Sequence, residues 1–195
     1  MSPEKNALPA HYQLTYSNAS IAEACQRLGA EISRWATEVA QLPGGSKAAD
    51  VTLLTIPILR GGLFFYADLV RAIASSVELV TATASSYGLS ANTQNTNAEI
   101  KTYIDAFSVA GRHILLVDDI CDSGKTLANL KADFLARGAA AVRTAVLIRR
   151  IVPGSPHTPD YVGFVYPGPE WFVGYGMDDE GKYRNLGAVY TMSKS

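Results

Sequence analysis

Apolar side chains recur along the chain with two different periods, and these periods predict its helices and strands. Residues 18–42 keep the helical spacing, with Asn18 or Ser20 as the candidate N-cap, and shorter helices are predicted over 63–74 and 124–137. Continuous, β-branched apolar runs predict buried strands, which cover residues 51–59, 77–84, 113–117 and 142–148. Because strands alternate with helices, we expect an α/β fold in which helices cover both faces of a parallel sheet.

Three stretches of the chain lack this regularity. Residues 1–17 are predicted to form a loose arm, and the polar stretch 85–96 is predicted to form a mobile loop. The part after residue 150 is rich in Pro, Gly and aromatic residues and is expected to carry shorter strands. With 195 residues, of which 48% are hydrophobic, the chain is expected to form a single domain with its own core.

Charge and composition narrow the function classes. A net charge of −1 gives no indication of nucleic-acid binding, and Arg60 interrupts the longest apolar run, so no membrane span is predicted. Residues 1–8 lack the apolar stretch of a signal peptide. The two cysteines, Cys25 and Cys121, lack metal-ligand spacing, which favours a reduced, cytoplasmic setting.

The most specific chemical signal lies where the apolar run 114–117 ends. Asp118 and Asp119 follow at once, and Asp122 precedes Ser123-Gly124-Lys125-Thr126 at the start of a predicted helix. Backbone N–H groups at a helix start attract phosphate, and carboxylates suit sugar hydroxyls or a hard cation. We therefore expect a phosphorylated sugar to bind at the carboxyl edge of the sheet.

A nucleotide-hydrolase phosphate loop is the obvious alternative, because Gly124-Lys125-Thr126 matches the end of its Gly-x-x-x-x-Gly-Lys-Thr pattern. The first glycine of that pattern would fall at position 119, which is Asp119. A carboxylate there would repel a triphosphate and block close approach of the backbone. We reject this alternative for that reason.

Residues 117–127, VDDICDSGKTL, resemble the phosphoribosyl-pyrophosphate signature of type I phosphoribosyltransferases. Residues 58–69 look like the pyrophosphate-binding loop of the 6-oxopurine branch, and residues 85–88 look like the start of its flexible lid. The purine-binding part of that branch is similar to residues 159–164, 171–178 and 183–186. The similarity covers roughly residues 50–192, and the family that it indicates is hypoxanthine-guanine phosphoribosyltransferase.

The resemblance implies a reaction and its central residues. A 5-phosphoribosyl group would pass from phosphoribosyl pyrophosphate to N9 of a purine base in purine salvage, with Mg²⁺ as cofactor. Asp118 and Asp119 would hold the ribose hydroxyls, directly or through Mg²⁺, and Asp122 would be the general base or acid at purine N7. An alternative role for Asp122 is a helix N-cap, which needs the same residue type.

The resemblance also implies two anion sites. The 5′-phosphate would contact backbone N–H groups and hydroxyls of Ser123, Gly124, Lys125 and Thr126. The pyrophosphate would contact Arg60 and Gly61, in a turn that can carry a cis peptide bond and where the family commonly has lysine in place of Arg60. Arg184 would also contact the pyrophosphate. Ordinary alternatives are a solvated helix residue for Lys125, a simple glycine turn at 60–62 and a surface salt bridge for Arg184.

For the purine, the resemblance implies stacking on Trp171, backbone carbonyls from Phe172 and Asp178, and a second Mg²⁺ at Asp178. A core tryptophan is the alternative for Trp171. The family usually has lysine at the position of Arg149, where it donates to the purine O6, and the adjacent Arg150 leaves a one-residue ambiguity. Because arginine offers only donors, a 6-oxo group should still be favoured over the 6-amino group of adenine.

Several further features are implied by the resemblance. Ser86 and Tyr87 would cover the reaction centre when the 85–96 loop closes, unless this stretch is an ordinary disordered loop. A small hood would be formed by residues from about 1 to 45 and from about 150 to 195. The protein would be a homodimer or homotetramer.

Two other functions stay open as alternatives. One is a xanthine-preferring phosphoribosyltransferase, which Arg149 suggests. The other is a nucleotide-sensing regulator that keeps this fold and binds RNA. The lack of net positive charge and the retained purine-binding segment argue against the regulator.

Overall fold

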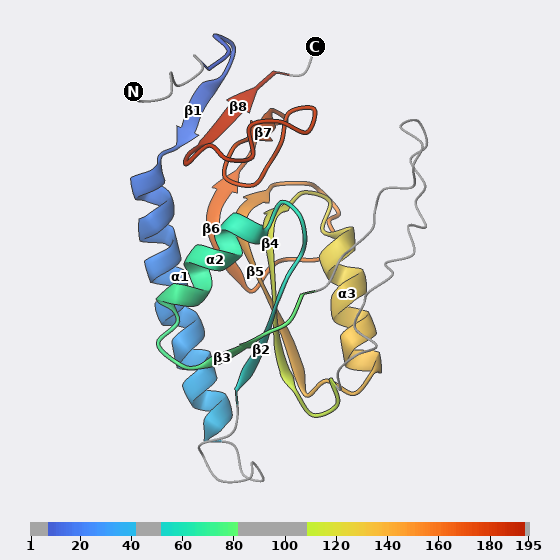
Figure 1. Ribbon diagram of the computed structural model, residues 1–195. Helices are drawn as coiled ribbons and strands as arrows, with labels where there is room; N and C mark the ends of the chain where they lie inside the picture. The colour runs from blue at the N-terminus through green and yellow to red at the C-terminus, as the bar shows by residue number, and fades with distance from the viewer. Residues whose placement is uncertain (1–7, 42–51, 82–108, 194–195) are drawn as a thin grey trace.

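A central sheet of five parallel strands organises the computed structural model, which describes residues 8–41, 52–81 and 109–193 (Figure 1). All four neighbouring strand pairs run parallel, so the carboxyl ends of the strands meet at one edge. In spatial order the strands are β3 (Val77–Leu79), β2 (Leu53–Pro57), β4 (His113–Cys121), β5 (Ala141–Arg150) and β6 (Tyr161–Tyr166).

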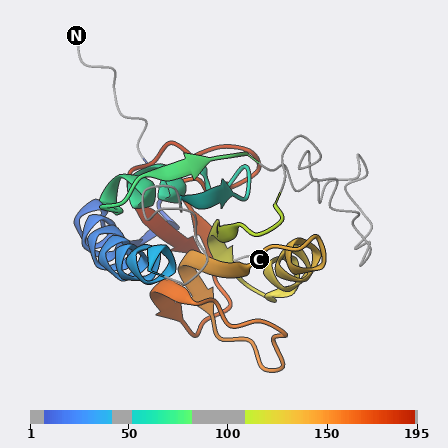
Figure 2. The same cartoon turned by 90° about the horizontal axis from the view of Figure 1, so that it is seen from below.

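Helices cover both faces of this sheet. α1 (Asn18–Ala40) and α2 (Leu63–Ala72) lie on one face and α3 (Lys125–Ala136) lies on the other, as Figure 1 and Figure 2 show. Two buried clusters result, one between the sheet and the α1–α2 pair and one between the sheet and α3. The predicted α/β class, with a parallel sheet and helices on both faces, is confirmed.

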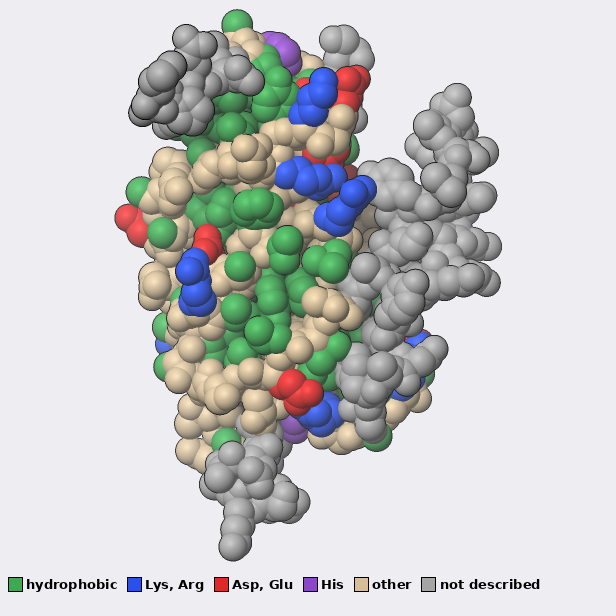
Figure 3. Space-filling model, in the orientation of Figure 1, with side chains coloured by type: hydrophobic (Ala, Val, Ile, Leu, Met, Phe, Trp, Pro, Cys, Tyr) green, Lys and Arg blue, Asp and Glu red, His purple; other side chains and the backbone are tan. Residues whose placement is uncertain are grey.

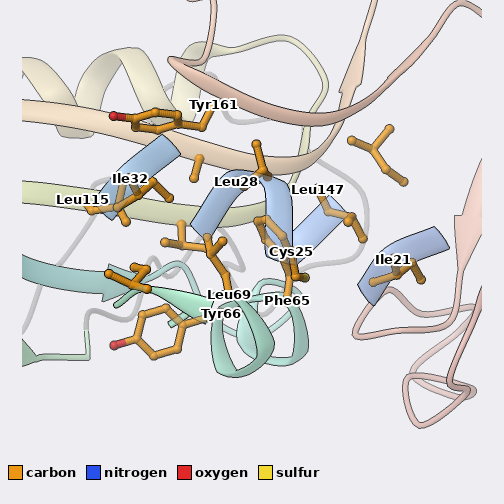
Figure 4. Close-up of a cluster of buried hydrophobic side chains, with 14 of the residues drawn as sticks. Ile21, Cys25, Leu28, Ile32, Phe65, Tyr66, Leu69, Leu115, Leu147 and Tyr161 are labelled. Carbon is orange, nitrogen blue, oxygen red and sulfur yellow. The ribbon is translucent and has the colours of Figure 1, made fainter. Parts of the chain in front are cut away.

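The larger cluster explains the position of α1. Its buried residues return every three or four positions, and Ile21, Leu28 and Ile32 are at most 2% exposed. Figure 4 shows these side chains gathered with Phe65 and Leu69 of α2. The long helix is therefore held by an apolar stripe that faces α2 and the sheet.

A second sheet, the terminal sheet, joins the two ends of the described chain. β8 (Val189–Met192) lies between β1 (Gln13–Tyr16) and β7 (Trp171–Val173) and runs antiparallel to both. In Figure 1 the terminal sheet stands beyond the carboxyl edge of the central sheet. The prediction of a loose arm is wrong for residues 13–16, because their partner strand is remote in the sequence and leaves no local pattern.

Smaller differences concern the ends of elements. The N-cap of α1 is Ser17, whose hydroxyl accepts the Ser20 backbone N–H at 3.1 Å, so neither predicted cap is correct. β3 ends at Leu79, well before residue 84, and residues 82–84 lie outside the described ranges. None of the helices in the described ranges has the length and apolarity needed to cross a bilayer.

Candidate functional site

Strand β4 carries the first two candidate residues. Asp118 pairs with Val146 of β5, and the ladder continues to Cys121, which pairs with Arg149. The prediction that this strand ends at residue 117 is therefore wrong, because main-chain pairing with β5 extends beyond the apolar run. Asp118 and Asp119 consequently lie on the end of a central strand, where the backbone is more rigid than in a turn.

The two adjacent carboxylates are fixed by the backbone but differ in exposure, because Asp119 is buried and Asp118 is half-buried. Asp118 Oδ1 accepts the Asp119 N–H and Asp119 Oδ1 accepts the Ile120 N–H, both at 2.9 Å. Burial and the charge of Asp119 raise the pKa of Asp118. Burial also raises the pKa of Asp119, although hydrogen bonds and the Arg184 charge oppose this shift. Both acids are suited to partners that stabilise negative charge, such as hydroxyl donors or a divalent cation.

The turn from β2 to α2 packs directly on this pair. A β-carbon on Gly61 would overlap Asp119 Oδ2, and a β-carbon on Gly176 would overlap the Gly61 carbonyl oxygen. The Leu59–Arg60 peptide bond is cis, and the Arg60 side chain is exposed. Residue 61 must be glycine here because the carboxylate occupies the space of a side chain.

The turn from β4 to α3 is shaped to receive an anion. Gly124 is the N-cap of α3 with φ of +75°, and a β-carbon there would lie 2.5 Å from Ser155 Oγ. Ser155 Oγ lies 3.0 Å from the Ser123 carbonyl oxygen, so the 151–160 loop packs against this turn. Because glycine supplies no capping side chain, backbone N–H groups of the first helical turn, where Lys125 and Thr126 are exposed, can receive an anion.

Asp122 is not the N-cap of α3, so that alternative for this residue is wrong. Its exposed carboxylate forms an ion pair with Arg150, in which Nε and Oδ1 are 2.8 Å apart. Arg150 also donates to the carbonyl of Gly168 and, at 2.8 Å, to the carbonyl of Glu170. A single guanidinium therefore connects the acidic turn to the segment that precedes β7.

The two neighbouring arginines of β5 have different surroundings. Arg149 pairs with Cys121 in the sheet, and its charge lowers the pKa of that thiol against a larger upward shift caused by burial. Within the described ranges, the Arg149 guanidinium has no hydrogen bond or ion pair. Of the two residues that the sequence could not separate, Arg150 contacts Asp122 and Arg149 lies beside Cys121.

Strand β7 and the loop after it bring further candidates together. Trp171 is 41% exposed, so the alternative of a core tryptophan is wrong, and its Nε1–H donates to the Asp178 carbonyl at 2.8 Å. The Asp178 carboxylate pairs with Arg184, which also donates to the Gly176 carbonyl. Phe172 is buried next to Trp171. This loop therefore links the strand that bears Trp171 to the glycine turn after β2.

One contact of this loop was missed from the sequence. Tyr12 Oη donates to Asp179 Oδ2 at 2.6 Å, and the Tyr12 ring meets Tyr183 edge-on at 5.5 Å. The partners are 167 residues apart, and no motif marks the tyrosine. The predicted lid residues Ser86 and Tyr87 lie outside the described ranges.

The carboxylates of Asp118 and Asp119 have the oxygen donors that Mg²⁺ prefers. The described ranges contain no group of three or more His, Cys, Asp or Glu side chains that could hold a metal ion. Mg²⁺ usually takes only one or two carboxylates and completes its shell with water and substrate phosphates, so Asp118 and Asp119 fit it. The Asp178 carboxylate is engaged by Arg184 and by the Gly181 N–H at 2.7 Å.

Comparisons with known sequences agree with one another. Residues 21–180 match the model of a family described as the phosphoribosyl transferase domain. The chain is 32% identical over 180 residues to the hypoxanthine phosphoribosyltransferase of Haemophilus influenzae, covering 92% of this chain and 94% of that protein. It is 34% identical over 175 residues to the hypoxanthine-guanine phosphoribosyltransferase of Streptococcus pneumoniae, covering 87% of each.

Solved structures show the same likeness. A hypoxanthine-guanine phosphoribosyltransferase from Bacillus anthracis superposes with a TM-score of 0.72 at 29% identity, covering 91% of this chain and 95% of that one. A ternary substrates complex of a mutant hypoxanthine phosphoribosyltransferase from Trypanosoma cruzi gives a TM-score of 0.77 at 26% identity, covering 92% and 94%.

Proposed function

The chain belongs to the phosphoribosyltransferase family, and on that basis we propose that it transfers the 5-phosphoribosyl group of phosphoribosyl pyrophosphate to N9 of hypoxanthine or guanine. The products are IMP or GMP and pyrophosphate, which makes the enzyme a pentosyltransferase of purine salvage. The observation that carries the proposal is the packing of Asp119 on Gly61, which joins the carboxylate pair of β4 to the turn after β2.

The sugar and 5′-phosphate of the donor fit the end of β4 and the start of α3. Asp118 and Asp119 bind the ribose 2′- and 3′-hydroxyls, because ionised carboxylates offer only acceptors. Residues 123–126 bind the phosphate through backbone N–H groups and two hydroxyls. The two contacts hold the anomeric carbon close to carboxylate charge, which stabilises an oxocarbenium-like transition state.

The leaving pyrophosphate is assigned to the glycine turn and its cationic neighbours. The exposed guanidinium of Arg60, the Gly61 backbone and Arg184 surround it in this proposal, and charge-assisted bonds favour its departure. Mg²⁺ held by Asp118 and Asp119 would neutralise charge on the donor phosphates. A second Mg²⁺ at Asp178 would require its ion pair with Arg184 to open.

The purine is assigned to β7. Trp171 offers a partly exposed aromatic face for stacking, and the backbone carbonyls of Phe172 and Asp178 accept from the edge of the base. Arg149 donates to O6, in agreement with the lack of an ion pair to another described residue. Asp122 takes or gives the N7 proton, because its carboxylate is exposed at the turn that holds the sugar.

We extend the proposal to the surroundings of the site. Ser86 and Tyr87 belong to a lid, and the terminal sheet, which stands over the carboxyl edge of the central sheet in Figure 1, belongs to a hood. The protein works in the cytoplasm as a homodimer or homotetramer, a state that light scattering would measure. Two buried free thiols, Cys25 and Cys121, agree with a reducing compartment.

The RNA-binding alternative gains no support. On the face drawn in Figure 3, basic and acidic side chains are interspersed, whereas an RNA surface needs a continuous basic stripe. We therefore keep catalysis as the proposed function.

The test is a rate assay with phosphoribosyl pyrophosphate and Mg²⁺, in which hypoxanthine, guanine, xanthine and adenine are offered separately. We expect turnover of hypoxanthine and guanine, and Asp122→Asn should lower kcat by about 100-fold or more. Turnover of xanthine alone would contradict the proposed preference for hypoxanthine and guanine and would favour the xanthine-preferring alternative. Tight binding of the donor without turnover of any base would contradict the proposed reaction.

A further inference from the structure

We propose that Arg150 is a positioning residue that fixes the Asp122 carboxylate relative to the base-binding strand β7. The inference rests on the proposed function, because it concerns the geometry of the proton-transfer step. It assigns to Arg150 a role distinct from the O6 contact that the proposed function gives to Arg149.

One ion pair and two hydrogen bonds define the role. Nε of Arg150 lies 2.8 Å from Asp122 Oδ1, one terminal nitrogen donates to the Gly168 carbonyl, and the other donates to the Glu170 carbonyl at 2.8 Å. Glu170 immediately precedes Trp171, the first residue of β7, and Gly168 lies two residues before Glu170. The guanidinium therefore contacts both the acidic turn at Asp122 and the segment that precedes β7.

Packing makes this connection rigid. The Arg150 side chain is only 12% exposed, and its guanidinium carbon lies 5.0 Å from the centre of the Phe172 ring and 5.8 Å from that of Tyr166. Such cation–π contacts hold the planar group in one orientation. The Asp122 side chain, by contrast, is 64% exposed and has no packing of comparable extent. The packed partner is thus the arginine, and it restrains the exposed carboxylate.

The register of β5 separates Arg150 from Arg149. Adjacent strand residues point to opposite faces, and here Arg149 lies beside Cys121 while Arg150 packs over Phe172. Neither residue can therefore take the place of the other without a shift of the strand.

The arrangement matters because proton transfer depends on sub-ångström placement. The base stacks on Trp171 and accepts or loses its N7 proton at Asp122, so the distance between β7 and Asp122 sets the geometry of that step. A misplacement of about 1 Å can lower the rate about 100-fold. Arg150 is the described residue that bonds to both sides of this distance.

The experiment compares Arg150→Met and Arg150→Lys with wild type, using the full chain, phosphoribosyl pyrophosphate, Mg²⁺ and hypoxanthine. We expect Arg150→Met to lower kcat by about 10- to 100-fold. Lysine can pair with Asp122, so Arg150→Lys should keep most of the wild-type kcat. Because lysine cannot span the two carbonyls, its KM for hypoxanthine should be about 5-fold or more above that of wild type. Arg112→Met is the matched control, since Arg112 pairs with the exposed Glu78 and directly precedes β4, at the opposite edge of the sheet.

A double-mutant cycle tests whether Arg150 acts through Asp122. In an Asp122→Asn background, Arg150→Met should lower kcat by less than about 3-fold, because the carboxylate that it positions is already gone. An equal loss in both backgrounds, or an unchanged kcat in Arg150→Met, would overturn the inference. If Arg150→Met fails to fold, the same cycle is run with Arg150→Lys and judged on KM. Inactivity of the wild type with all four bases would instead contradict the proposed function.

Discussion

The backbone of Gly61 lies directly against the carboxylate of Asp119, so closely that a β-carbon on Gly61 would overlap Asp119 Oδ2. The turn assigned to pyrophosphate and the strand end assigned to ribose are therefore one packed unit. Any shift of the first displaces the second, which couples the two ends of the same donor molecule.

Gly61→Ala should inactivate the enzyme without unfolding it. The added methyl group must push the Asp119 carboxylate or the turn aside, and a displacement of this size should lower kcat/KM for the donor by about 100-fold or more. Steady-state kinetics and a thermal melt would measure the two effects separately.

Gly111→Ala is the control for Gly61→Ala. A β-carbon on Gly111 meets no atom within 4 Å, and its φ of +72° makes alanine strained by about 1 kcal/mol. We expect a small loss of stability with normal kinetics. Similar activity in both variants would show that the contact at Gly61 is not required.

Asp118→Asn should stabilise the protein while abolishing donor binding. The ionised form of Asp118 is desolvated and lies next to Asp119, which is why its pKa is raised. Removal of this charge should raise Tm by about 2–4 °C, which corresponds to about 1 kcal/mol in a chain of this size. Differential scanning calorimetry without Mg²⁺ would measure the change.

The pH dependence of that gain has a definite sign. Because the folded-state pKa of Asp118 lies above the unfolded value, the unfavourable charge is fully present at pH above the folded pKa and is relieved as protonation proceeds. The advantage of Asp118→Asn should therefore be largest at high pH and shrink on acidification. An advantage that grows on acidification would contradict the environment described for Asp118.

Trp171 should report base binding by its fluorescence. The chain has two tryptophans, of which Trp35 is 3% exposed and packed beneath Arg143, whereas Trp171 is 41% exposed. We expect IMP to quench Trp171 and to leave Trp35 unchanged, so quenching should vanish in Trp171→Phe.

Stacking also predicts the kinetic effect at this position. Trp171→Ala should raise KM for hypoxanthine about 10-fold or more, since an aromatic–base stack contributes about 1–3 kcal/mol. Trp171→Phe keeps an aromatic face and should change KM by less than about 3-fold. Equal effects of the two substitutions would argue against stacking.

His157 should make part of the stability depend on pH. Its Nε2 lies 2.9 Å from Thr144 Oγ1, and burial, together with the Lys131 charge, lowers its pKa despite the opposing charge of Asp160. Because the folded state disfavours protonated His157, the free energy of unfolding falls as the pH drops below 6.5, the pKa of histidine in the unfolded chain.

His157→Gln should flatten this loss, because glutamine can place a polar atom near Thr144 and does not titrate. Urea unfolding at several pH values between about 8 and 5 would measure the slope for both proteins. His113, whose pKa burial also lowers, should keep a residual slope in the variant. An identical slope in wild type and variant would contradict the assignment to His157.

Patterns confined to neighbouring residues predicted most of the central sheet. Asp118 and Asp119 were identifiable because two acids directly after a buried apolar run are unusual, and the phosphate turn follows within a few residues. The end of β4 was misplaced because pairing with β5 does not depend on apolar side chains. Local signals are thus enough to propose a site, but they do not give the exact position of its backbone.

Features that depend on distant partners could not be predicted. β1 pairs with β8, and Thr15 and Thr191, which share a hydrogen bond, are 176 residues apart. The separate roles of Arg149 and Arg150 depend on which face each presents at the end of β5, and a shift of one residue would exchange them. The register of a strand, which decides the face that each residue presents, cannot be inferred from local sequence patterns.

The strand order of the terminal sheet has a consequence for synthesis on the ribosome. β8 follows every other element along the chain, yet it lies between β1 and β7 and pairs with both. During translation, the carboxyl edge of the central sheet, where the donor is proposed to bind, can form before β8 is synthesised. At that stage β1 and β7 both lack the strand with which they pair. The nascent chain should therefore hold phosphoribosyl pyrophosphate before it can hold a purine.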